Sequence, residues 1–237
     1  MLEYGNRLKD LRLKAIGWYR MGCAHIVQGD IEAGLRCCDE ALALEATPYD
    51  VGMANAYRGY GEIKAGLVEM GIARLEAAVA WFDNSRQRYS QLRVAVWLAE
   101  GYLRQGDREK AAPLIDDMLN TSRANGYRYL AGLASWLKGV SSAAEAPAAA
   151  VDHVGEAMRI LDAIGARNDL AEAMVTRAAL WQLSGEIAKA RQMLDAARAV
   201  FRALGTRDDS DWIKAQIEAP DARLAASRID PLAATSG

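Results

Sequence analysis

The sequence predicts an all-α fold, a right-handed superhelix (α-solenoid) of about five antiparallel helix pairs, and three observations predict it. Turn positions recur every 37 to 40 residues, at Gly29, Gly66, Gly106, a position near Glu145, and Gly185. Small or apolar residues follow at fixed distances, five positions on (Gly34, Gly71, Ala111, Ala150, Ala190) and twelve positions on (Ala41, Ala78, Met118, Ala157, Ala197). The composition is 51% apolar with only two Phe, and β-branched runs are almost absent. A period of this length is typical of stacked-repeat proteins.

Each repeat is expected to consist of helix A, a tight turn and helix B. In the first repeat, Gly29 ends helix A because glycine adopts the left-handed conformation without steric cost. Asp30 is placed to cap helix B, and Gly22 and Gly34 let the two helices approach closely. We expect a repeat domain over residues 1–219 and a poorly ordered tail over 220–237. The repeats are expected near 7–46, 47–84, 88–124, 126–165 and 168–205, with a capping helix at 210–219.

Four local features depart from this pattern. Leu67 occupies the position where an acidic helix cap is usual, and the fourth repeat lacks the turn glycine. Pro113 lies about six residues into helix B of the third repeat, where it is expected to bend or delay that helix. Leu8 and Leu11 lead into the first helix A and predict that this helix extends beyond its normal length.

The pattern W-x-x-x-G, then QGD, then a small residue and Ala41 resembles the tetratricopeptide repeat, with Gly29, Asp30, Gly34 and Ala41 on that family's turn and packing positions. The segments LRQGDREKAAPLIDDML and QLSGEIAKARQMLDAARAVF carry the same resemblance. The longer Leu-Gly-x-Arg-x-Asp connection resembles the helical C-terminal regions of bacterial MalT-like regulators and of adenylate/guanylate cyclase-type signalling ATPases. This resemblance implies a regulatory or signalling arm, with roles in scaffolding or transcription regulation, although no G-x-x-x-x-G-K-[ST] phosphate loop is present.

Charge and composition weigh against several classes of partner. The net charge is −2 and Lys and Arg alternate with Asp and Glu, so we expect no nucleic-acid partner. No uncharged apolar stretch is long enough to predict a membrane span. The three cysteines fall within the first 40 residues and form a poor disulfide framework, which favours a cytoplasmic protein.

Residues with catalytic or metal-binding chemistry are few. Cys23, His25, Cys37 and Cys38 belong to one repeat, but the adjacent cysteines lack the spacing of a zinc site and core packing is the preferred interpretation. The two histidines, His25 and His153, lie in different repeats, so the sequence does not favour a Ser/His/Asp catalytic arrangement. We therefore expect no enzyme activity, no catalytic residue, no metal and no cofactor.

The A helices of such an array line its concave side, where partners bind. Counting back from the turns gives the candidate partner-binding residues Tyr19, Tyr60, Lys64, Arg93, Trp97, Glu100, Arg104 and Gln182. Tyr19, Tyr60, Arg93 and Arg104 together suit an acidic or carboxylate-ended peptide. The alternative is that Tyr60 and Arg93 only close the groove, and that the tryptophans are packing residues.

The favoured function is a non-enzymatic module that binds a protein or peptide segment in this groove. The alternative is an effector-sensing domain that encloses a small molecule within the superhelix. Self-association through the terminal repeats can coexist with either function, because the end of a truncated array exposes apolar surface.

Overall fold

The computed structural model describes residues 1–206, which are all-helical, with eleven α-helices and no strand. The chain divides into two compact units, Met1–Gly101 and Tyr102–Gly237. The expected capping helix at 210–219 and tail at 220–237 lie outside the described residues.

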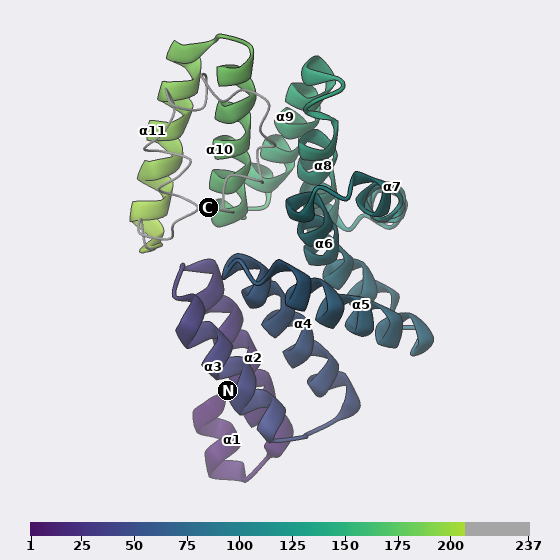
Figure 1. Ribbon diagram of the computed structural model, residues 1–237. Coiled ribbons are helices and arrows are strands. Elements are labelled where there is room, and N and C mark those ends of the chain that lie inside the picture. The colour runs from purple at the N-terminus through teal and green to yellow at the C-terminus, as the bar shows by residue number, and fades with distance from the viewer. Residues whose placement is uncertain (207–237) are drawn as a thin grey trace. The chain divides into compact units, whose positions relative to one another are not determined.

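The helices of the first unit follow one another closely along the chain. They are α1 (Leu2–Leu8), α2 (Leu11–Val27), α3 (Ile31–Ala43), α4 (Pro48–Lys64), α5 (Val68–Asn84) and the larger part of α6 (Arg88–Gln105). Helix α2 packs on α3 and on α4, α3 packs on α4, and α4 packs on α5 (Figure 1). Each helix therefore buries its apolar face against its neighbours in sequence, as a repeat array requires.

The second unit is built in the same way. It contains the end of α6, then α7 (Arg108–Asn125), α8 (Arg128–Ser142), α9 (Pro147–Ala163), α10 (Arg167–Leu183) and α11 (Ile187–Leu204). Each of α7 to α10 packs on the helix that follows it. Among the described residues, none of the helices combines the length and the apolar character that crossing a membrane would need.

The turns between paired helices carry the predicted left-handed glycines. Gly29, Gly66, Gly106 and Gly185 have φ between 81° and 88°, in the region that other residues rarely adopt. The fourth turn, between α8 and α9, has no glycine, and Pro147 starts α9 at a position where proline is tolerated.

The predicted caps and the predicted close approach of paired helices are confirmed. The Asp30 carboxylate accepts a hydrogen bond from the Ala33 amide at 3.3 Å, and Leu67 forms no side-chain cap. A Cβ atom added to Gly22 would lie 2.9 Å from the Gly34 carbonyl oxygen, closer than real Cβ contacts. The backbones of α2 and α3 thus approach closely because neither residue carries a side chain.

The expected extension of the first helix A is wrong, and of the two effects expected of Pro113 the delay is wrong whereas the bend stays a prediction. The first helix A does not extend to the N-terminus, because Lys9 adopts a left-handed conformation (φ 54°) and separates α1 from α2. Asp10 then begins α2 as its cap, accepting a hydrogen bond from the Leu13 amide at 3.0 Å. Pro113 does not delay α7, which starts at Arg108 and runs through the proline. Asp107 caps the start of α7 and stabilises its first turn, which lies before the proline and does not need the N–H that Pro113 lacks.

Candidate functional site

The first unit holds six of the eight predicted partner-binding residues, on three successive A helices. They are Tyr19 on α2, Tyr60 and Lys64 on α4, and Arg93, Trp97 and Glu100 on α6. Arg104 and Gln182 belong to the second unit, on α6 and α10, and both are buried. Partner binding by these eight residues stays a prediction, but the structure defines their surroundings.

Four aromatic rings form a continuous row across α2, α4 and α6, which we call the aromatic row: Tyr19, Tyr57, Tyr60 and Trp97. The rings of Tyr19 and Tyr57 stack with centroids 5.6 Å apart. Trp97 lies 5.1 Å from Tyr57 and stacks on Tyr60 at 5.0 Å. The repeat period produces this row, since Tyr19, Tyr57 and Trp97 lie nine or ten positions before the turn glycine of their repeats. Ring pairs at these distances, two of them stacked and the Tyr57–Trp97 pair tilted, are favoured beyond the area that they bury.

The tyrosines of the row are enclosed, whereas Trp97 is only partly buried. Tyr19, Tyr57 and Tyr60 keep 7% or less of their surface exposed. Burial raises the pKa of Tyr57 to about 12, so its hydroxyl stays neutral at physiological pH. The three tyrosines are therefore packed residues, and the accessible surface beside them belongs to their neighbours.

Arg93 lies beside the aromatic row and contacts two of its rings. Its guanidinium carbon lies 5.4 Å from the ring centre of Tyr57 and 5.9 Å from that of Trp97, within the range of a cation–π contact. Its Nη2 donates to the sulfur of Met53 at 3.5 Å, and its Nε has no hydrogen-bond partner. No carboxylate of residues 1–206 pairs with Arg93. The structure thus holds a half-buried cation against aromatic faces without a counter-ion from the described chain.

Lys64 and Glu100 pair with each other instead of presenting two free charges. The Lys64 ammonium lies 3.0 Å from the Glu100 carboxylate, whose side chain is 2% exposed. The same ammonium lies 5.3 Å from the ring centre of Tyr60. The Lys64–Glu100 pair thus lies beside Tyr60, at one member of the aromatic row.

A second group of polar residues, which the sequence analysis did not identify, joins α3, α4 and α5. Glu62 is fully buried and pairs with both Arg58 and Arg74. Arg58 also reaches Asp39 on α3 at 2.6 Å, and Arg74 donates to Asn55 at 2.7 Å. The spacing of Arg58 and Glu62, one helical turn apart, was a signal for part of this network. The link to Arg74 crosses a turn and follows only from the packing of α4 on α5.

The cysteines of the first repeat have surroundings that suit packing. Cys38 is fully buried, and burial raises the pKa of its thiol to about 12. Cys37 is also buried, whereas His25 is only partly buried near the end of α2. Within residues 1–206, no three His, Cys, Asp or Glu side chains are grouped as a metal site would require.

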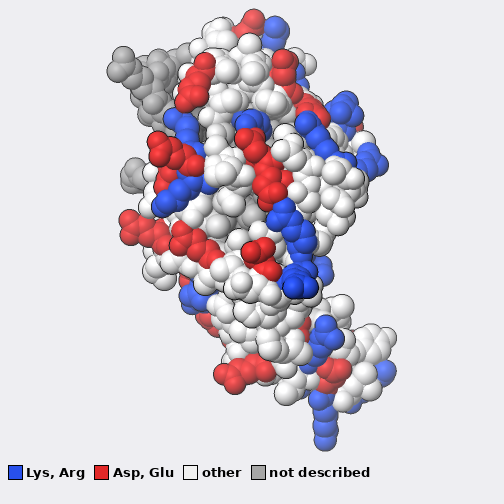
Figure 2. All heavy atoms as spheres, turned by 90° about the vertical axis from the view of Figure 1, so that its right-hand side faces the viewer, with Lys and Arg blue, Asp and Glu red and all other residues white. Residues whose placement is uncertain are grey.

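Surface charges of both signs alternate on the face that Figure 2 displays. In the second unit, Lys138 on α8 pairs with Asp116 on α7 at 2.6 Å, and Arg123 on α7 pairs with Glu156 on α9 at 2.9 Å. Such exposed pairs contribute little to stability. Neither a protein-family model nor a curated protein matches the sequence with significant similarity.

Proposed function

We propose that the chain is a non-enzymatic binding module that recognises a carboxylate-bearing protein or peptide segment through Arg93 and Trp97. The observation that carries the proposal is the Arg93 guanidinium, held against two rings of the aromatic row without a carboxylate partner in the described chain.

The chemistry of Arg93 supports a carboxylate. A guanidinium is always charged and offers parallel N–H groups that match the two oxygens of a carboxylate. Stacking on Tyr57 and Trp97 restricts its motion before binding, which lowers the entropy lost when a ligand is bound. Asp and Glu side chains and a peptide C-terminus all supply the required group.

The surroundings of Arg93 support a peptide segment as the bearer of that carboxylate. Trp97 lies one helical turn from Arg93 and is partly exposed, so an apolar side chain can pack on it beside the ion pair. Arg and Trp are the residue types that most often dominate binding energy at protein interfaces. Repeat arrays present such residues on extended surfaces, which suit a chain segment.

The finer biological setting belongs to the same proposal. A regulatory or signalling arm is consistent with the tetratricopeptide-like turn and packing residues described above. Three free cysteines, two of them buried, are consistent with a reducing cytoplasm.

The test is selection of short random peptides displayed with free C-termini, followed by fluorescence anisotropy of the selected peptides. We expect enrichment of Asp, Glu or a required C-terminal carboxylate. Arg93→Ala should weaken binding by about tenfold or more, since a charge-assisted hydrogen bond contributes about 1.5–3 kcal/mol. Arg36→Ala is the matched control, because this arginine is exposed on α3 and its one side-chain hydrogen bond within residues 1–206 is to Glu32, one turn away. Equal binding by both variants, or peptides without an acidic preference, would contradict the proposal.

A further inference from the structure

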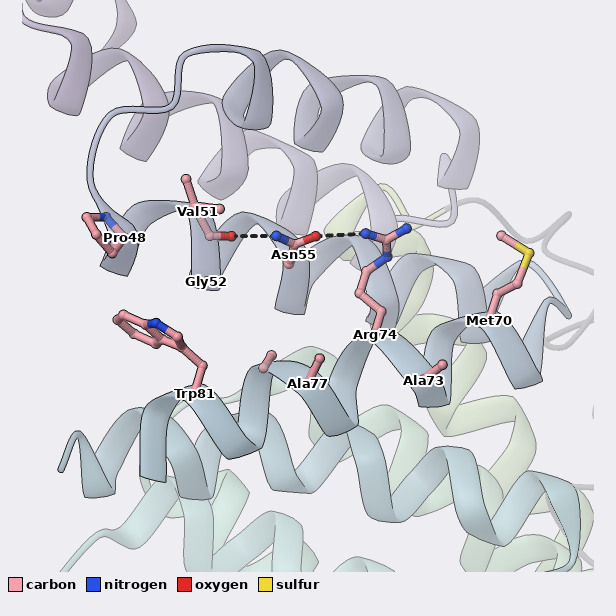
Figure 3. A pocket seen from close by; sticks show the side chains of 10 residues that line it. Pro48, Val51, Gly52, Asn55, Met70, Ala73, Arg74, Ala77 and Trp81 are labelled. Atoms are coloured by element: carbon pink, nitrogen blue, oxygen red, sulfur yellow. Dashed lines mark hydrogen bonds between the residues drawn. The ribbon is translucent and has the colours of Figure 1, made fainter. Parts of the chain in front are cut away.

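A pocket with a volume of about 600 Å³ lies between α4 and α5, outside the aromatic row. Its residues come from the helix faces shown in Figure 3. They are Pro48, Val51, Gly52, Asn55, Met70, Ala73, Arg74, Ala77, Ala78 and Trp81. None of them is among the partner-binding residues predicted from the sequence. The volume falls within the range of pockets that hold small organic molecules.

The walls of the pocket are apolar and one end is aromatic. Trp81 and Pro48 lie at one end of the view in Figure 3 and Met70 at the other, with Ala73 and Ala77 between them. A Cβ atom on Gly52 would lie 3.2 Å from the Trp81 ring, so the absence of a side chain there lets the ring approach α4. Because Ala73 and Ala77 are small, the α5 side of the pocket stays open beside this ring.

Arg74 is the one charged residue that lines the pocket, and its neighbours fix its position. Its Nε and Nη2 donate to the two oxygens of Glu62 at 2.9 and 3.2 Å, and its Nη1 donates to Asn55 at 2.7 Å. Asn55 is itself anchored through its amide nitrogen to the Val51 carbonyl at 3.0 Å. Three of the five N–H groups of a guanidinium are thereby used, and the other two have no acceptor in the described chain.

The N–H groups that Arg74 leaves unused favour an anion. Glu62 carries one negative charge and is shared by Arg58 and Arg74, so these three side chains together keep one positive charge. Asp39 pairs with Arg58 at 2.6 Å and offsets that charge, so an anion would be held by the N–H groups of Arg74 and not by a net charge. Arg74 is 31% exposed, which leaves it accessible from the pocket.

The spacing of Arg74 and Trp81 defines the shape of the ligand. Arg74 and Trp81 lie seven residues apart on α5, which is two helical turns on one face. At 1.5 Å per residue, this spacing corresponds to about 10 Å. We propose that the α4–α5 pocket binds a small monocarboxylate whose carboxylate pairs with Arg74 and whose apolar, ring-ended body lies along Ala73 and Ala77 toward Trp81.

The test is isothermal titration calorimetry of the full chain with 6-phenylhexanoate, whose ring and carboxylate are separated by about this distance. A ligand of this size should bind with a Kd near 1 mM or tighter. We expect the neutral 6-phenylhexan-1-ol to bind about tenfold more weakly, because it lacks the charge that Arg74 would pair with. No saturation below about 5 mM, or equal affinity for the alcohol, would overturn the proposal.

Ala77→Phe locates the binding, because residue 77 is an exposed position that lines the pocket and a phenyl group there fills it. Ala80→Phe is the matched control, the same change at an exposed position of α5 outside the pocket. We expect Ala77→Phe to abolish binding of 6-phenylhexanoate and Ala80→Phe to leave the Kd within about twofold. Equal binding by both variants would place the ligand elsewhere and overturn the assignment. Since none of these measurements involves Arg93, they remain informative whether or not the peptide-binding proposal holds.

Discussion

Arg74 and Arg93 are both held in place by their neighbours, but by different kinds of contact, and only one of these kinds could be predicted from the sequence. Arg74 is fixed by a buried carboxylate and an amide, and Arg93 by two aromatic faces. The position of Arg93 near an aromatic surface could be predicted because the repeat period aligns residues of successive A helices. Tyr57 was missed although it lies at the centre of the row, since counting from the turns selected Tyr60 alone on that part of α4. The partners of Arg74 could not be predicted, because they depend on how α4 and α5 pack.

Close backbone contact between paired helices makes a prediction for single glycines. A Cβ atom on Gly71 would lie 2.6 Å from the Gly59 carbonyl oxygen and 2.6 Å from Ile63, so Gly71→Ala forces α4 and α5 apart. We expect a loss of about 1–3 kcal/mol in the free energy of unfolding, as for other overpacked cores. Urea denaturation followed by circular dichroism measures it.

The control is the same substitution at Gly155, inside α9. A Cβ atom there would meet only the guanidinium end of the Arg177 side chain, at 3.2 Å, and this end can move. Gly155→Ala should be neutral or stabilising by up to about 1 kcal/mol, because alanine favours helix more than glycine does. If both variants lose the same stability, the close contact of α4 and α5 is not the reason.

The ends of the helices are the feature of the individual elements that the sequence predicted best. Left-handed glycines and acidic caps have local causes, so their positions were readable without knowledge of packing. The break at Lys9 was missed because lysine rarely adopts positive φ and the apolar pattern continues across it. A second set of left-handed glycines, Gly126, Gly165 and Gly205, follows the helices B of the second unit, α7, α9 and α11.

The uncapped start of α5 makes a prediction at this scale. Leu67 is 47% exposed at the N-cap position and forms no cap, so Leu67→Asp should stabilise the protein by about 0.5–1 kcal/mol. Leu67→Ala separates this gain from the loss of the leucine side chain, since alanine caps poorly. Thermal unfolding of the three proteins decides the point, and an aspartate variant no more stable than the alanine variant would exclude a capping gain.

At the scale of the whole molecule, the two compact units share one way of packing, in which each helix contacts its neighbours in sequence. The fold class could be predicted because the period, the small residues and the turns all point to the same architecture. The candidate sites were harder to predict, because burial is a property of the assembled array. Tyr19 and Glu100 are both nearly fully buried, which no count along one helix can indicate.

Alkaline pH should lower the stability of the whole chain. The pKa of Cys38 rises from 9.0 to about 12 and that of Tyr57 from 10.0 to about 12, in both cases chiefly because of burial. Both groups stay neutral in the folded state but ionise in the unfolded state above their ordinary pKa values. The stability that they contribute is therefore complete below about pH 9 and is lost progressively toward pH 12. We expect the free energy of unfolding to fall by about 3 kcal/mol between pH 8 and pH 10.5, about two thirds of it from Cys38.

Urea denaturation at the two pH values tests this expectation with two variants. Cys38→Ala removes one of the two groups with the pKa values given above and should make the loss of stability between the two pH values smaller. Tyr4→Phe is the control, because Tyr4 is 57% exposed and its removal should leave the loss unchanged. An undiminished loss in Cys38→Ala would mean that other groups cause the alkaline destabilisation.

The stacking of Tyr60 on Trp97 also has an optical consequence. Light absorbed by tyrosines in contact with an indole is passed to that indole, and a guanidinium beside the ring alters its emission. Trp97 has Tyr57 and Tyr60 within 5.1 Å and Arg93 over its face, so its fluorescence depends on the position of that arginine. The difference between the emission spectra of the native chain and of Trp97→Phe isolates this signal from the other tryptophans. The protein thus contains an intrinsic reporter for any ligand that draws Arg93 away from the rings.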